Sequence, residues 1–254
     1  MIDVYNSWIQ RWQNAGVDKT KIGNLLFYNR NARIHAPELY RLLNADLGAI
    51  LNSSANQVRL HFAAKPVDPH QAKPAFTIII DSFSSNANET VGFNDLHDNA
   101  KEMEFIFDSA AREIPLGKRD EISQDEAHAF DSSYLSFADA LSGNTLVDDT
   151  FVGTYFLGTV NGSEELVRGF NLSDSDVAKM RAKYENEEDI NLFVYITAAV
   201  SELVEGDPFS VRPVLMLART FTDYSNALYF EYSRPCPPIC DTFVDSSLPH
   251  GDKK

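Results

Sequence analysis

The most regular pattern of apolar and polar positions lies in the last quarter of the chain. In Asn191–Val200 every even position is aliphatic while the odd positions are mixed, and Ala227–Ser233 alternates in a similar way. Between them, Ser210–Thr220 contains an almost unbroken apolar run. A period of two predicts strands, because successive strand side chains point to opposite faces. The connections are too short for parallel crossovers, so the three segments predict an antiparallel meander.

A second pair of strands is expected before residue 85. In 57–62 apolar residues alternate with polar ones, which predicts a strand with one face in solvent and His61 on that face. Phe76–Ile80 is richer in apolar residues and predicts a more buried strand that ends at Asp81. We interpret Asp81 as the polar exit of this strand into a loop. The two strands would then form a hairpin-like pair with a long connection.

The dipeptide Asn161-Gly162 predicts a tight hairpin. It lies between Thr150–Val160 and Glu164–Phe170, two segments that read as strands. A type I′ turn needs a positive φ at both central residues, and asparagine followed by glycine adopts that conformation at low steric cost. We therefore expect the two segments to pair as antiparallel neighbours.

Helical spacing of apolar residues predicts five helices, over 1–13, Pro37–Leu51, Asn94–Ile114, Ser123–Gly143 and Ser173–Glu187. The third of these has an alternative, because the alternation over Met103–Phe107 also fits a strand. Asn14–Ile34 is polar and contains two glycines, and we interpret it as irregular.

Runs of strands separated by pairs of helices predict an α+β fold. We expect mostly antiparallel sheet with helices packed on one face and the C-terminal three-stranded meander. The length allows one large domain over 1–254, and 143–150 is where a subdivision would fall. The mostly polar residues 245–254 predict a frayed tail.

Charge and cysteine content narrow the compartment and the partners. The formal net charge of -15 repels phosphate backbones and anionic lipid, so we expect neither nucleic acid nor membrane as a partner. No apolar stretch is long enough to span a bilayer, and the first residues lack the pattern of a secretory signal, which predicts a cytoplasmic protein. In that compartment Cys236 and Cys240 are expected as reduced thiols, with a local disulfide or a shared metal ion as the alternatives.

Asp46 is the first candidate site residue. In helical projection it interrupts the apolar stripe of Pro37–Leu51, and a buried carboxylate is costly unless it is paired. Either it lies at the rim of the core, paired with an arginine such as Arg33 or Arg41, or it is a functional acid.

The predicted helix Ser123–Gly143 carries the second candidate group. Asp125 and His128 are three residues apart, so one metal ion can reach both, with Asp131 as a third ligand and His97 approaching from the preceding helix. In projection, however, Asp125 and His128 lie opposite the apolar face. That position favours a solvated acidic surface near a helix N-terminus.

The chain contains no motif for phosphate binding, dinucleotide binding, serine nucleophiles or zinc proteases. Missing motifs weigh against an enzyme without ruling it out, since residues distant in sequence can meet in space. We therefore predict a non-enzymatic protein-interaction or assembly module with no cofactor. Its self-association face would be built from aromatic side chains, namely Trp8, Trp12, Tyr195, Tyr229 and Tyr232.

Two alternatives belong to other functional classes. One is a metal-assisted hydrolase with the metal held by Asp125, His128 and Asp131, for which Asp46 and His97 are the candidate catalytic residues. The other is a small-ligand-binding protein with a pocket between helices and sheet, where Asp46 would anchor the ligand.

Overall fold

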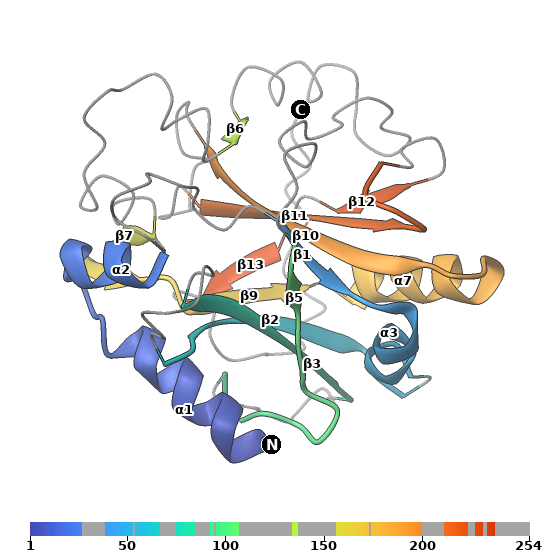
Figure 1. Ribbon diagram of the computed structural model, residues 1–254, viewed down its shortest axis with the longest axis horizontal. Coiled ribbons are helices and arrows are strands. Elements are labelled where there is room, and N and C mark those ends of the chain that lie inside the picture. The colour runs from blue at the N-terminus through green and yellow to red at the C-terminus, as the bar shows by residue number, and fades with distance from the viewer. Residues whose placement is uncertain are drawn as a thin grey trace.

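The computed structural model of the chain describes residues 1–26, 39–52, 54–66, 75–84, 92–93, 95–106, 134–136, 156–172, 174–199, 211–222, 227–230 and 233–236. Within them, two antiparallel sheets lie face to face, and helices pack below and beside them (Figure 1). The fold is α+β with mostly antiparallel sheet, as the sequence predicts.

The first sheet, called sheet A, contains the C-terminal meander. Its strand order is β12-β11-β10-β1-β5, and β6 also pairs with β10. The strands are β1 (Leu39–Leu42), β5 (Glu104–Phe105), β6 (Tyr134–Ser136), β10 (Asn191–Ala199), β11 (Val211–Ala218) and β12 (Leu228–Phe230). The antiparallel pairs β10–β11 and β11–β12 confirm the predicted meander.

The second sheet, called sheet B, has the strand order β13-β9-β2-β3-β4. The strands are β2 (Gln57–Ala64), β3 (Phe76–Phe83), β4 (Lys101–Glu102), β9 (Gly169–Leu172) and β13 (Ser233–Cys236). The antiparallel pair β2–β3 confirms the hairpin-like pair. However, β3 continues to Phe83, so Asp81 lies within the strand and the interpretation of Asp81 as its exit is wrong.

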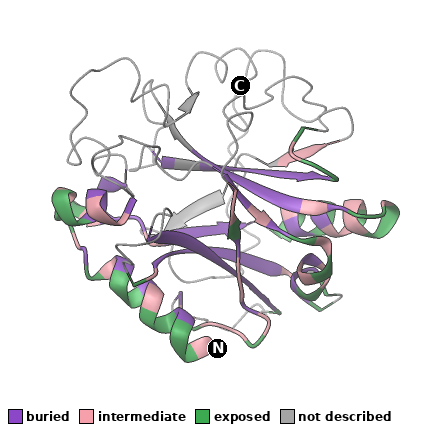
Figure 2. Cartoon of the chain, in the orientation of Figure 1, coloured by how far each residue is buried: buried purple, intermediate pink, exposed green. Residues whose placement is uncertain are grey.

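The main core fills the space between the sheets. Leu60 and Phe62 of β2 belong to the same apolar cluster as Val194 of β10 and Leu215 of β11. The central strands of both sheets are buried, whereas the outer sides of the helices are exposed (Figure 2). Every residue of β2 is buried, so the predicted solvent-facing side is wrong, because other segments cover the outer face of sheet B.

Four helices lie within the described residues: α1 (Ile2–Gln13), α2 (Lys19–Leu26), α3 (Asn44–Ile50) and α7 (Asp174–Asn186). Helices α1 and α7 confirm two of the predicted helices. Apolar residues of α1 pack on the outer face of sheet B, with Tyr5 and Ile9 beside Ile79 of β3. None of these four helices is long and apolar enough to cross a membrane.

Two predicted helices are partly strands. In Pro37–Leu51 the helix begins only at Asn44, because Leu39–Leu42 forms β1 and hydrogen bonds to β10 and β5 on its two sides. In Asn94–Ile114 the described residues, which end at 106, contain β4 and β5 and no helix. The chain passes from sheet B to sheet A there through the buried Met103, which agrees with the strand alternative over that segment.

Four further predictions are corrected or lie outside the described residues. In Ser123–Gly143 the described residues form strand β6, not a helix, and the rest of that segment lies outside the description. In Asn14–Ile34, helix α2 replaces the expected irregular chain. The proposed division at 143–150 and the tail 245–254 also lie outside it.

The predicted turn at Asn161-Gly162 is confirmed. It joins β7 (Leu157–Val160) to β8 (Ser163–Leu166), with φ values of 51° and 82° at the two turn residues. The second strand is shorter than predicted. It ends at Leu166, and Gly169–Leu172 joins sheet B as β9, because it pairs there with β2 and β13.

Candidate functional site

The candidate site lies on the outer face of sheet B, which is the face turned away from sheet A. Arg59 and His61 of β2 point to this face together with Asp81 of β3, while the residues between them point to the core. The register pairs Arg59 directly with Asp81. Residues paired across antiparallel strands share a face, so the sheet itself places two basic side chains beside a carboxylate.

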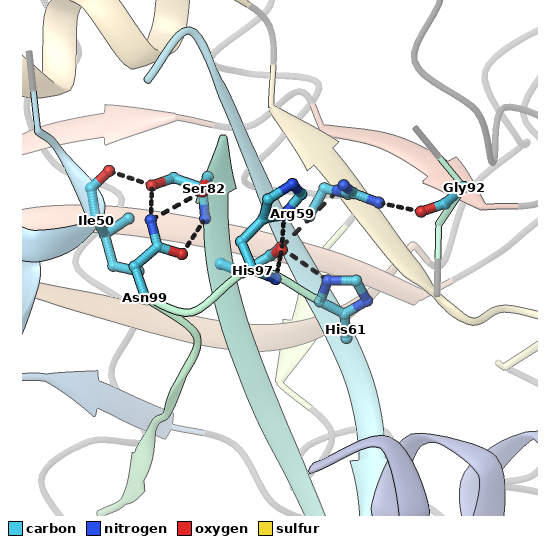
Figure 3. Close-up of polar contacts among 8 residues, drawn as sticks. Ile50, Arg59, His61, Ser82, Gly92, His97 and Asn99 are labelled. Carbon is cyan, nitrogen blue, oxygen red and sulfur yellow. Dashed lines mark hydrogen bonds and ion pairs between the residues drawn. The ribbon is translucent and has the colours of Figure 1, made fainter. Parts of the chain in front are cut away.

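Asp81 is the centre of a polar network that also contains Arg59, His61 and His97, which we call the Asp81 cluster (Figure 3). Its Oδ1 lies 2.8 Å from His61 Nε2 and 3.8 Å from Arg59 Nε. Its Oδ2 lies 2.9 Å from His97 Nδ1 and accepts a 3.3 Å hydrogen bond from the His97 backbone N–H. The side chains of Arg59, His61 and Asp81 are fully buried, whereas that of His97 is 35% exposed.

Asp81 is ionised in this environment. Burial by itself would raise the pKa of the Asp81 carboxyl, but the charge of His61, the hydrogen bonds from His61 and His97, and the charge of Arg59 outweigh burial and hold that pKa well below its usual range. An ionised carboxylate only accepts hydrogen bonds. The contacting nitrogens, His61 Nε2 and His97 Nδ1, therefore both carry protons.

The ring of His97 is held in two ways. Nδ1 donates to Asp81, and the ring stacks on Phe83 with centroids 4.7 Å apart and an angle of 6° between the planes. Phe83 also lies under the guanidinium of Arg59, whose Cζ is 4.1 Å from the ring centroid. With Nδ1 engaged, Nε2 is the His97 nitrogen left to exchange a proton or to contact a ligand.

The cluster is covered by residues 92–93 and 95–99. Arg59 Nη1 donates to the Gly92 carbonyl oxygen at 2.7 Å, and the Phe93 ring lies 4.7 Å from the His61 ring, centroid to centroid. Asn99 Nδ2 donates to the Ser82 carbonyl oxygen and to Ser82 Oγ, both at 2.8 Å (Figure 3). The contacts of Gly92 and Phe93 explain why Arg59 and His61 of β2 are buried although both side chains are polar.

The structure places the sequence-derived candidates in different surroundings. His97 belongs to the Asp81 cluster. Asp46 lies at the rim, 44% exposed, with its Oδ1 2.9 Å from Lys101 Nζ. Its partner among the described residues is Lys101, whereas Arg41 forms an ion pair with Glu104 instead and Arg33 lies outside the description.

The metal-site candidates Asp125, His128 and Asp131 lie outside the described residues. Among the residues that are described, no three histidine, cysteine or acidic side chains are grouped so as to hold a metal ion. The pairing of Cys236 with Cys240 is not tested either, because Cys240 lies outside the description.

Sequence reasoning missed three members of the cluster. His61 is buried and not solvated, and Arg59 and Asp81 were not candidates. A signal was present, because two basic residues alternate with apolar ones in β2 and the paired strand β3 offers one acid. This signal predicts a cluster only when the register of β2 with β3 is known, because the register places Arg59 opposite Asp81.

No protein-family model, curated protein or solved structure matches this chain.

Proposed function

We propose that the protein hydrolyses a small ester substrate, with Asp81 and His97 as an acid–base pair. The observation that carries this proposal is the 2.9 Å contact between fully buried Asp81 and partly exposed His97. A buried carboxylate orients the imidazole and selects its tautomer, while the exposed edge of the ring can meet water and substrate.

The proposed reaction needs one proton carrier. Nε2 of His97 removes a proton from a water molecule as the water oxygen bonds to the ester carbonyl carbon. The same proton then passes from Nε2 to the leaving-group oxygen as the carbon–oxygen bond breaks. Asp81 stabilises the imidazolium that exists between these two steps, as a carboxylate does in other acid–base pairs.

The test uses p-nitrophenyl acetate as the probe substrate. We expect wild-type protein to accelerate its hydrolysis, and His97→Asn to lower the rate about 10²- to 10⁴-fold, which is the usual contribution of a general base. His250→Asn is the control, because it removes a histidine from the predicted tail. Wild-type protein without activity, or equal rates in the His97 and His250 variants, would reject the proposal.

Self-association, which the sequence also suggested, is the second candidate function. The residues that support it differ from the aromatic ones named in the sequence analysis. Trp12 and Tyr195 are buried, so they cannot contribute to the aromatic face predicted above. The exposed apolar side chains at the start of α1 now favour it, with Met1 82% and Val4 48% exposed. Native mass spectrometry should then show a dimer that Val4→Asp weakens, and a strict monomer would count against this function.

A further inference from the structure

We propose that His61 is a positioning residue that acts through Asp81 and holds the carboxylate in the orientation that His97 requires. The effect of His61 on catalysis rests on the proposed function. Its effect on the tautomer of His97 can be measured without a substrate. His61 was expected on a solvated face, and the buried geometry assigns it this different role.

An aspartate side chain has rotational freedom at its carboxylate. The terminal torsion of aspartate is broad and roughly two-fold, so packing alone defines the directions of its two oxygens poorly. In the Asp81 cluster the oxygens have different donors. His61 donates to Oδ1 at 2.8 Å, and His97 donates to Oδ2 at 2.9 Å from its ring and at 3.3 Å from its backbone. If the Asp81 carboxylate rotates so that Oδ1 loses the hydrogen bond from His61, Oδ2 therefore loses the hydrogen bond from His97 as well.

His61 is itself held in place, which a positioning residue must be. It is fully buried in the middle of β2, and Phe93 lies against its ring with centroids 4.7 Å apart. Gly169 is its partner on β9, and a Cβ added to Gly169 would lie 2.8 Å from Phe93 Cζ. Phe93 thus occupies the space that a side chain at 169 would need, and it packs against the imidazole there.

Arg59 is the other charged group facing Asp81 from β2, and it does not replace His61. Its Nε lies 3.8 Å from Oδ1, beyond hydrogen-bond distance, while its Nη1 donates to Gly92. Arg59 therefore supplies charge near the carboxylate, whereas His61 supplies the directional hydrogen bond to Oδ1.

Two substitutions of His61 distinguish a positioning role from a role in packing. Both introduce a side-chain amide, but the two amides extend to different distances from the backbone. In His61→Gln the amide nitrogen reaches the place of Nε2 and can still donate to Oδ1. In His61→Asn the amide nitrogen reaches only the place of Nδ1. The shorter variant therefore keeps a polar amide at this position but loses the contact with Asp81.

The measurement is ¹⁵N NMR of the imidazole rings, which reports the tautomer of each histidine. In wild-type protein we expect the proton on Nε2 of His61 and on Nδ1 of His97. His61→Gln should keep the His97 tautomer ratio. His61→Asn should shift that ratio about tenfold towards the Nε2–H form, since the hydrogen bond to Asp81 is weakened.

The outcomes are decisive even if one variant does not fold. A wild-type His61 without a proton on Nε2 would overturn the inference, and so would an unchanged His97 ratio in folded His61→Asn. If only His61→Gln folds, a preserved ratio supports positioning and a tenfold shift contradicts it. Failure of ester hydrolysis with these tautomers intact would reject the proposed function and leave the role of His61 standing.

Discussion

Replacing Asp81 by asparagine is expected to lower the free energy of unfolding by about 3–5 kcal/mol, the usual cost of removing one partner from a buried ion pair. The asparagine side chain would keep the shape but lose the charge that balances the fully buried Arg59. It would also present an amide N–H to a ring nitrogen that now donates, either His61 Nε2 or His97 Nδ1. Chemical denaturation of both proteins measures the difference.

The matched control is Asp46→Asn, which removes a carboxylate from an ion pair at the rim. Asp46 is 44% exposed and contacts Lys101, so its loss should cost about 1 kcal/mol or less. Equal destabilisation by the two substitutions would show that Asp81 is not held as the buried cluster implies.

The cost of Asp81→Asn should also depend on pH with a defined sign. The pKa of Asp81 is held below its value in the unfolded chain, so its ionised form stabilises the fold above that unfolded value. At about pH 5 the aspartate of the unfolded chain is ionised, so the difference between the two proteins contains the full contribution of the Asp81 charge. It should shrink below about pH 4, where the aspartate of the unfolded chain becomes protonated. A difference that grew as the pH was lowered below about 4 would contradict this sign.

Gly169→Ala is expected to cost about 3 kcal/mol, at the upper end of the range for overpacking. An added Cβ would lie 1.9 Å from the Leu60 carbonyl oxygen and 2.8 Å from Phe93 Cζ. The first contact is with backbone in the neighbouring strand β2, so the sheet must shift to relieve it. The shift would also move Phe93, which packs against His61. Thermal unfolding should show the destabilisation as a lower Tm.

Gly162→Ala is the control for Gly169→Ala, because it carries the conformational cost of replacing a glycine without a steric clash. Gly162 has a φ of 82° in the β7–β8 turn, and an added Cβ would meet nothing within 4 Å. Its loss should therefore cost only about 1–2 kcal/mol, the strain of a left-handed residue. A smaller effect at Gly169 than at Gly162 would contradict the close approach of the strands.

The elements that local sequence predicted correctly are those with a long, unambiguous period. Asn191–Ala199 alternates over its whole length, α1 repeats at helical spacing, and Asn161-Gly162 specifies its turn by backbone sterics. Leu39–Leu42 is different, because four residues rich in leucine fit a helix and a strand equally well. Its partners β10 and β5 decide the matter, and they lie far away in the sequence.

The candidate site divides in the same way. His97 was selected from the sequence as a residue type suited to acid–base chemistry, but nothing near it in the chain indicated a partner. Its partner Asp81 lies 16 residues earlier, and the second histidine comes from another strand.

The amino-acid sequence by itself determined the α+β class, the C-terminal meander and the Asn161-Gly162 turn, since short-range sterics and the period of side-chain burial suffice for these. Only the tertiary structure decided that Arg59 and His61 are buried and that Asp81 lies between two histidines. The reason is physical: the burial of a polar side chain depends on what covers it, and here Gly92 and Phe93 lie against Arg59 and His61. Once covered, those side chains must satisfy one another, and the register of β2 with β3 sets which of them meet.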